Sequence, residues 1–242
     1  MEIILCIPGP WNDRTEFLQA VVEQNTGTYI FAGQILLNLE TQESFQVELY
    51  EADDRLLESF RHALRPDTAT EENLQPIAQH KMVAYLIGPG GSFDTAKSMA
   101  HAAKALLAAG GLGVKVETAG TAFTPQQWQQ MLENGNPVDL YAMYVIDAIG
   151  NSTDLLYSCG MHNLGLKDTI VRGLEFQAAY QVLSTFNYYL LLENPDIEEN
   201  QTFSIAEDAP RFVIKDEVHQ PNKGEELFEN PFGMWSLNKV DG

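Results

Sequence analysis

The chain has 242 residues, of which 45% are hydrophobic and 20% are charged, and its formal net charge at pH 7 is −20. This apolar content excludes an intrinsically disordered chain, and no apolar run approaches the roughly 20 residues that a membrane-spanning helix needs. Because the negative charge repels phosphate groups, neither nucleic acid nor an anionic membrane surface is expected as a partner.

The negative charge is concentrated in two parts of the chain. Residues 1–72 carry 14 acidic and 4 basic side chains, and residues 193–229 carry 11 and 3, whereas the segment between them is nearly neutral. Such acidic flanks favour a basic protein as the partner. The alternative is that the excess carboxylates only keep the protein in solution.

Residues 2–7 are predicted to form the first strand. The segment is mostly apolar, it ends at a turn rich in proline and glycine, and it lacks the basic residues that begin a secretory signal peptide, so a cytoplasmic protein is expected. Cys6 and Cys159 are the only cysteines. In a cytoplasmic protein, two unpaired thiols are expected rather than a disulfide.

Capping residues and hydrophobic periodicity predict the other elements of the N-terminal part. Asp13 and Glu16 have the spacing of a capping box and begin a helix, and alternating apolar and polar residues then predict a hairpin. An apolar stripe predicts a second helix, and the polar stretch after it is predicted to be a linker. In chain order, these elements are a helix from residue 13, strands at 29–39 and 44–50, a helix from residue 53 or 54 to 64, and a linker at 66–79.

The second part begins with an apolar strand that leads through a glycine-rich bend into a helix. Thr124, Pro125 and Gln127 then provide an N-cap, a first-turn proline and a capping-box partner, which predict another helix. The longest predicted helix carries its apolar residues on one side, as docking on a sheet requires. The predicted elements, in order, are a strand at 82–87, a helix at 93–109, a strand at 112–117, a helix from 124, strands at 138–147, 153–159 and 169–171, the long helix at 174–192, and strands at 203–205 and 211–214.

This order of elements predicts the α+β class, with mixed or antiparallel sheets covered by helices. The preferred architecture is two ferredoxin-like halves, 1–72 and 80–216, followed by an acidic tail at 217–242. One compact domain with a continuous mixed sheet is the alternative.

The sequence GPGGS, residues 88–92, lies where a predicted strand meets a helix. Free backbone N–H groups at a helix N-terminus can bind an anion, but the spacing here matches neither a Walker loop nor a dinucleotide-binding loop. Ser92 or Asp94 could instead cap the helix, so a simple turn is expected and no cofactor is predicted. The candidate anion-binding residues are Gly88, Gly90, Gly91, Ser92 and Lys97.

Lys97, His101 and Lys104 recur at a spacing that places them on one face of the predicted helix at 93–109. A solvated basic stripe is one interpretation. The other is that the stripe pairs with an acidic flank, either within the molecule or across a dimer.

Cys159 and His162 are candidates for a nucleophile and its base, because they follow the same predicted strand. Packing is the expected role, since the two residues are only three positions apart beside a glycine. The spacing of histidines and cysteines does not match a zinc site, so no metal is predicted.

The sequence ENPFGMW near the C-terminus brings Phe232, Met234 and Trp235 together after a highly charged run. Exposed in water, these side chains would form an apolar patch, so they are expected to cover another surface. They dock either on the protein's own sheet or on a partner protein.

Five of these segments resemble a family of bacterial proteins known as a domain of unknown function, family 4261. The resemblance lies in CIPGPW, YLIGPGGS, GVKVETAGTAF, LYSCGM and NPFGMW, and it is clearest over residues 81–192. It implies a bacterial cytosolic protein with an α+β fold, and it implies no catalytic residues.

Two functions follow from these patterns. The first is a non-catalytic module that binds a basic protein, as an immunity protein or inhibitor does, because an acidic surface accelerates the capture of basic proteins. The alternative is an enzyme or sensor for a small anion or nucleotide, using residues 88–92 with Lys97 and His162 nearby. The sequence indicates no oligomeric state.

Overall fold

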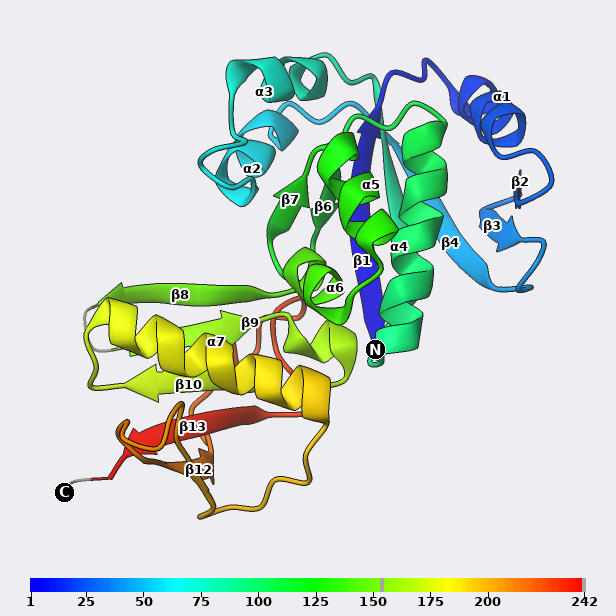
Figure 1. Ribbon diagram of the computed structural model, residues 1–242. Helices are drawn as coiled ribbons and strands as arrows, with labels where there is room; N and C mark the ends of the chain where they lie inside the picture. The colour runs from blue at the N-terminus through cyan, green and yellow to red at the C-terminus, as the bar shows by residue number, and fades with distance from the viewer. Residues whose placement is uncertain (153–154, 241–242) are drawn as a thin grey trace. The chain divides into compact units, whose positions relative to one another are not determined.

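The computed structural model of the chain describes residues 1–152 and 155–240, without the side chains of residues 148 and 150–152 (Figure 1). The chain divides into two compact units, Met1–Met143 and Tyr144–Gly242. Each unit contains one sheet and helices that pack on it, which confirms the α+β class. Within the described residues, no helix combines the length and the hydropathy that crossing a lipid bilayer requires.

The first unit has a seven-stranded sheet in the order β2-β3-β4-β5-β1-β6-β7, in which all neighbouring strands are antiparallel. Its strands are β1 (Glu2–Gly9), β2 (Tyr29–Ala32), β3 (Ile35–Asn38), β4 (Ser44–Glu51), β5 (Met82–Pro89), β6 (Val114–Val116) and β7 (Thr121–Phe123). Its helices are α1 (Arg14–Gln24), α2 (Leu56–Ala63), α3 (Glu71–Ala78), α4 (Phe93–Ala108), α5 (Pro125–Asn134) and α6 (Pro137–Tyr144).

Six of these elements form a ferredoxin-like core. In chain order they are β1, α1, β4, β5, α4 and β6, and their strands lie in the order β4-β5-β1-β6. Each of the two split βαβ units in this arrangement has one strand of the other unit between its own strands. The ferredoxin-like topology therefore occurs once, in residues 2–116, and not in each of two halves.

The expected boundary near residue 72 does not coincide with the division of the chain. Strand β5 follows that boundary, yet it pairs with β1 on one side and with β4 on the other, so both sides of the boundary share one sheet. The expected linker at 66–79 also contains helix α3, which Thr70 caps by accepting a hydrogen bond from Asn73 N at 3.3 Å. Helix α3 has only two buried apolar residues, Leu74 and Ile77, and its polar residues make this short apolar pattern hard to recognise in the sequence.

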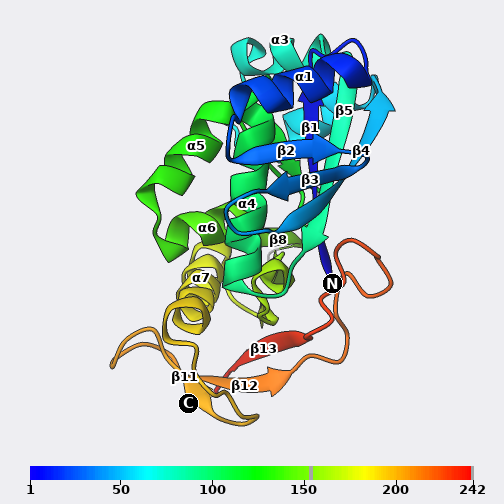
Figure 2. The same ribbon diagram turned by 90° about the vertical axis from the view of Figure 1, so that its right-hand side faces the viewer.

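Helices cover both faces of this sheet. Cys6 and Ile7 are adjacent in β1 and therefore point to opposite faces. On the Cys6 side, α2 and α3 pack their apolar residues against Cys6 and Val83. Helix α4 covers the other face, where its buried alanines permit a close approach, and it lies on one side of the strands in Figure 2.

The second unit has a six-stranded sheet in the order β11-β12-β13-β10-β9-β8. Helix α7 contacts β8, β9 and β10. In the part of this unit that the structure describes, α7 is the only long helix on the sheet, so the described strands and helix do not form a ferredoxin-like topology. Its elements are β8 (Ile146–Ser152), β9 (Leu155–Cys159), the short helix η1 (Met161–Leu164), β10 (Asp168–Arg172), α7 (Phe176–Glu193), β11 (Thr202–Phe203), β12 (Phe212–Asp216) and β13 (Met234–Lys239).

The expected acidic tail contains an inner strand of this sheet. Strand β13 is antiparallel to β12 and parallel to β10, so it lies between them. Met234 and Trp235 are 3% and 8% exposed, whereas Phe232 in the preceding turn is 43% exposed. Intramolecular docking therefore accounts for Met234 and Trp235, which leaves only Phe232 accessible to a partner.

The region between α5 and β9 differs from the expected pair of strands. Residues 138–147 were predicted to be a strand, but helix α6 begins at Pro137, and Asn136 caps it by accepting a hydrogen bond from Asp139 N at 2.8 Å. The apolar run after Pro137 can form either element, and the Asn–Pro cap favours the helix. Strand β8 follows it and includes much of the expected turn, while residues 153–154 lie outside the described residues.

Truncating Met234 should destabilise the second unit far more than truncating Phe232. We expect Met234→Ala to lower the free energy of unfolding by about 2 to 5 kcal/mol, because it leaves a cavity beside an inner strand. Phe232→Ala should change it by less than about 1 kcal/mol. Chemical denaturation of both variants measures the difference, and equal losses would contradict the placement of β13.

Candidate functional site

The glycine-rich bend between β5 and α4 is closed by contacts within the chain. Ser92 caps α4: its hydroxyl accepts a hydrogen bond from Thr95 N at 3.1 Å. The backbone N–H of Gly90 donates to Met1 O at 3.2 Å. Two N–H groups of this region therefore already have partners.

Packing and backbone conformation explain the three glycines of the bend. A Cβ at Gly88 would lie 2.5 Å from Met99 Sδ, and one at Gly90 would lie 2.8 Å from Ile3 Cγ1. Gly91 has a φ of 87°, which residues with side chains rarely adopt. The bend therefore needs glycine whether or not it binds an anion.

Lys97, the fifth candidate of this group, is exposed and lines a separate small cavity. That cavity has a volume of about 20 Å³, and it is lined mainly by apolar residues of α5 and α6, such as Met131 and Leu140. A space of this size holds a single water molecule at most.

Cys159 and His162 are both buried in the second unit. Burial, and then the charge of Asp168, raises the pKa of the Cys159 thiol to about 12. Burial lowers the pKa of His162 to about 4, and among the described residues His162 Nδ1 has no hydrogen-bond partner. A catalytic thiol needs a lowered pKa, so these environments favour packing over nucleophilic catalysis.

A buried carboxylate that the sequence analysis did not single out lies close to these two residues. Asp168 begins β10 and accepts hydrogen bonds from Ser158 Oγ at 3.1 Å, Met161 N at 3.2 Å and Asn230 Nδ2 at 2.7 Å. Burial raises the pKa of Asp168 to about 7, although the hydrogen bonds act in the opposite direction. The only sequence signal was a polar residue at the edge of an apolar segment.

The hydrogen bonds of Asp168 join three separate segments of the second unit. Ser158 belongs to β9, Met161 begins the turn after it, and Asn230 belongs to the long segment before β13. Asn230 also donates to Leu166 O at 2.9 Å. Because these partners of Asp168 are structural neighbours in the interior, its evident role is to hold these segments together.

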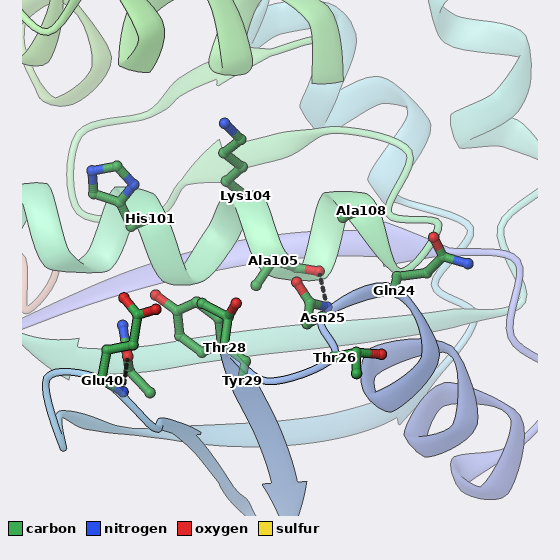
Figure 3. A pocket seen from close by; sticks show the side chains of 11 residues that line it. Gln24, Asn25, Thr26, Thr28, Tyr29, Glu40, His101, Lys104, Ala105 and Ala108 are labelled. Carbon is green, nitrogen blue, oxygen red and sulfur yellow. Dashed lines mark hydrogen bonds between the residues drawn. The ribbon is translucent and has the colours of Figure 1, made fainter.

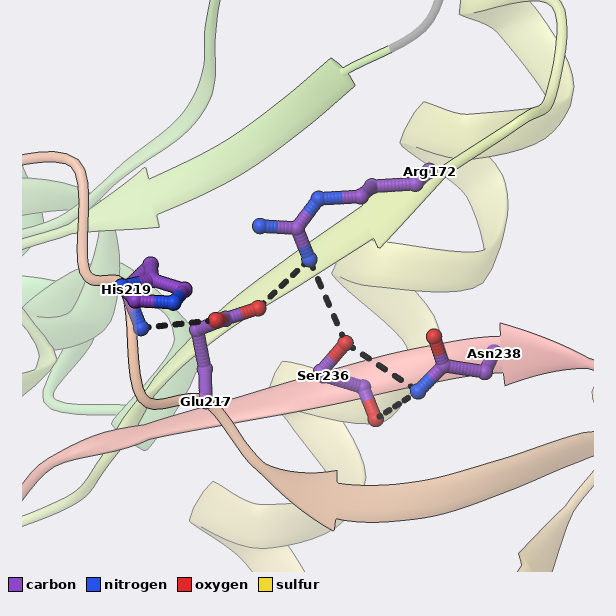
Figure 4. A network of polar contacts seen from close by, with 5 residues as sticks. All are labelled: Arg172, Glu217, His219, Ser236 and Asn238. Carbon is purple, nitrogen blue, oxygen red and sulfur yellow. Dashed lines mark hydrogen bonds and ion pairs between the residues drawn. The ribbon is translucent and has the colours of Figure 1, made fainter.

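A second polar network lies nearer the surface of the same unit (Figure 4). Glu217 forms an ion pair with Arg172 and accepts a hydrogen bond from His219 N at 2.8 Å. Burial acts to raise the pKa of Glu217, but the hydrogen bonds and positive charges of these two residues outweigh it and lower the pKa. Arg172 also donates to Ser236 Oγ at 3.4 Å, and Asn238 donates to the same oxygen at 3.1 Å. The network connects the start of the segment between β12 and β13 to β10 and to β13.

Within the described residues, no three His, Cys, Asp or Glu side chains lie close enough together to hold a metal ion.

The first unit contains a cavity of about 500 Å³ beside α4 (Figure 3). Residues from the end of α1, the start of β2, the end of β3 and one side of α4 line it. More than half of the lining side chains are polar and uncharged. The lining residues are Gln24, Asn25, Thr26, Thr28, Tyr29, Asn38, Glu40, His101, Lys104, Ala105 and Ala108.

Two members of the predicted basic stripe, His101 and Lys104, line this cavity. Burial, and then the charges of Lys97 and Lys104, lowers the pKa of His101. Among the described residues, no carboxylate forms an ion pair with Lys97 or Lys104. The predicted pairing of the stripe with an acidic flank therefore does not occur as direct contacts within the described chain.

A partly open surface lies on the side of the first sheet that faces away from α4. Gln46, Glu48 and Tyr50 of β4 alternate with the buried Phe45 and Val47 and the half-buried Leu49. The register places Glu48 opposite Tyr85 and Gln46 opposite Ile87. Directly opposed residues of antiparallel strands share a face of the sheet. We call these five residues, Gln46, Glu48, Tyr50, Tyr85 and Ile87, the β4–β5 face.

Two tyrosines and one carboxylate organise the β4–β5 face. The rings of Tyr50 and Tyr85 meet edge to face, with centroids 5.6 Å apart, and Tyr50 is 53% exposed. Glu48 accepts hydrogen bonds from Tyr50 Oη and Gln46 Nε2, each at 2.7 Å. The hydrogen bond to Glu48 and its charge raise the pKa of Tyr50. The face thus presents two aromatic rings beside the carboxylate of Glu48, which hydrogen bonds from Tyr50 and Gln46 hold in place.

Comparison of the chain with models of known protein families, with curated proteins and with solved structures finds no match. The resemblance to domain-of-unknown-function family 4261 therefore stays a prediction.

The two cysteines should not react with a thiol reagent while the protein is folded. We expect 5,5′-dithiobis(2-nitrobenzoic acid) at neutral pH to label neither Cys6 nor Cys159 until denaturant is added, because both thiols are buried and burial raises both pKa values. Absorbance at the wavelength of the released thiolate follows the reaction. Rapid labelling of Cys159 in the folded protein would contradict its packing role.

The stability of the second unit should depend on the titration of Asp168. The folded-state pKa lies above the ordinary value of an aspartate side chain, so the contribution of this group is present at low pH and is lost as the pH rises toward about 7. The melting temperature of the wild-type protein, relative to that of Asp168→Asn, should therefore fall between about pH 4 and pH 7. Asp208→Asn, at an exposed position, is the control and should retain the wild-type slope.

Proposed function

We propose that the protein is a non-catalytic binding module whose β4–β5 face binds a basic partner protein. It would act as an immunity protein or inhibitor does, in a bacterial cytoplasm. The observation that carries this proposal is the exposed Tyr50 ring beside Glu48 in a chain with a net charge of −20.

The chemistry of the face suits an arginine or lysine side chain. A guanidinium or ammonium group is attracted to the face of a tyrosine ring and, at the same site, to a carboxylate. Tyr50 provides the ring and Glu48 the carboxylate, and a hydrogen bond joins the two side chains. A cation seated on the ring would therefore pair with Glu48 without any rearrangement of the backbone.

The charge outside the face supports the same class of partner. Of the carboxylates near β4, Glu51 has no ion pair among the described residues, whereas Asp53 is paired with Arg55. The remaining excess of negative charge would draw a basic protein toward the surface from a distance and raise the rate of association. This attraction weakens as salt is added.

The alternative function, a sensor or enzyme for a small anion at residues 88–92, has less support. Ser92 caps the helix itself, and Gly90 N is bonded to Met1 O. Lys97, which was expected to assist anion binding, instead lines a separate cavity of about 20 Å³.

An arginine–glycine repeat peptide should bind the wild-type protein, and the double variant Glu48→Lys, Tyr50→Ala should bind it about tenfold more weakly. The double variant removes both the ring and the carboxylate that a cation would contact. Fluorescence anisotropy of the labelled peptide measures the affinity, and circular dichroism checks that the variant is folded. Adding salt should weaken the wild-type complex.

The matched control is Glu23→Lys, which makes the same change of charge at an exposed position of α1. It should retain most of the affinity for the peptide. If Glu23→Lys weakens binding as much as the double variant does, net charge alone attracts the peptide, and the proposal is wrong. Equal affinity for a glutamate–glycine repeat peptide would also contradict it.

A further inference from the structure

The cavity beside α4 has the size and the lining of a small-molecule site. Its volume of about 500 Å³ lies within the roughly 300 to 1,000 Å³ that ligand pockets span. Ala105 and Ala108 leave this space open, because their side chains end at a single methyl group. The cavity lies on the α4 side of the sheet, so it is separate from the β4–β5 face.

Internal contacts hold much of the lining in place. Asn25 Nδ2 donates to Val21 O and to Ala105 O, each at 3.0 Å, which ties the end of α1 to α4. Asn38 Oδ1 accepts hydrogen bonds from Glu40 N at 2.9 Å and from Thr41 N at 3.2 Å, which fixes the turn that carries Glu40. A ligand would therefore meet polar groups that are already ordered, and binding would lose little conformational entropy.

The charged groups of the lining come from different elements. Lys104 belongs to α4, whereas Glu40 follows β3, and Figure 3 shows Glu40 near Tyr29 with the Lys104 ammonium extending away from it. No ion pair joins the two residues. Each charge can therefore be neutralised by a ligand, and the flexible stem of Lys104 allows its ammonium group to turn toward one.

We propose that this cavity binds a free α-amino acid, with its carboxylate at Lys104 and its ammonium group at Glu40. A zwitterion is the small ligand that complements one positive and one negative group without leaving either unpaired. A purely anionic ligand would lie beside Glu40, and a purely cationic ligand would lie beside Lys104, so each would meet a like charge. Thr28, Asn25 and Gln24 also line the cavity, so it contains hydroxyl and amide groups that a polar side chain of the amino acid can meet.

His101 does not add a second full positive charge to this site. Burial and the two neighbouring lysines lower its pKa, and the charge of Glu43 acts in the opposite direction. Near neutral pH, Lys104 is therefore the cation of the cavity. This balance of one cation with one carboxylate favours a zwitterion over a phosphate.

The test is a thermal-shift screen of the wild-type protein with each common L-α-amino acid at about 10 mM, followed by calorimetric titration of any that stabilise it. At least one should raise the melting temperature. Its N-acetyl derivative, which lacks the ammonium charge, and its amide, which lacks the carboxylate, should each bind about tenfold more weakly.

Variants locate the site. Lys104→Met and Glu40→Gln should each lower the affinity for the amino acid about tenfold, and Ala108→Leu should prevent its binding by filling the cavity. Lys97→Met, on the same helix but outside this cavity, should leave the affinity within about twofold. The arginine–glycine peptide should still bind Lys104→Met, which separates this proposal from the protein-binding function.

Three results would overturn the proposal. The first is that no amino acid stabilises the protein in the screen. The second is that the N-acetyl derivative binds as well as the parent compound, which would indicate an anion site. The third is that Lys97→Met weakens binding as much as Lys104→Met, which would place the ligand elsewhere on the helix.

Discussion

The pairing of β5 with β1 is the interaction on which the first unit depends. Eight residue pairs join these strands, although they are separated by most of the N-terminal third of the chain. Once β5 lies between β1 and β4, the split βαβ topology follows, and α4 is led across the face that contains Ile7. On its other side β5 pairs with β4, which places Tyr85 opposite Glu48, so the proposed protein-binding face is a consequence of the core.

In the second unit, buried polar contacts join segments that are far apart in the chain, as strand pairing does in the first unit. Asp168 connects β10 with the segment after β9 and with Asn230, and Asn230 precedes the inner strand β13. A carboxylate in the interior is costly unless it is fully hydrogen-bonded. Such a residue can be mistaken for a catalytic acid, but each of its partners is a neighbouring part of the framework, so its chemistry serves the fold.

The two proposed sites use opposite sides of the same sheet for different chemistry. The β4–β5 face offers two tyrosine rings and a carboxylate on an open side of the sheet, which suits a side chain delivered by a large partner. The cavity beside α4 is a hollow that opens to solvent and has one charge of each sign in its lining, which suits a small dipolar molecule. Because the ferredoxin-like core separates them, either site can be altered without removing the other.

Local signals in the sequence were sufficient to predict the α+β class, the capped helices α4 and α5, the long helix α7 and the alternation along β4, since these depend on residues a few positions apart. They were insufficient for the single ferredoxin-like core, the inner position of β13, the helix at 137–144 and the network of Asp168. The sites were also beyond them: Glu48 meets Tyr85, and Lys104 shares a cavity with Glu40, only through strand register and helix packing. Those relations join residues far apart in the chain, and they exist only once the tertiary structure has formed.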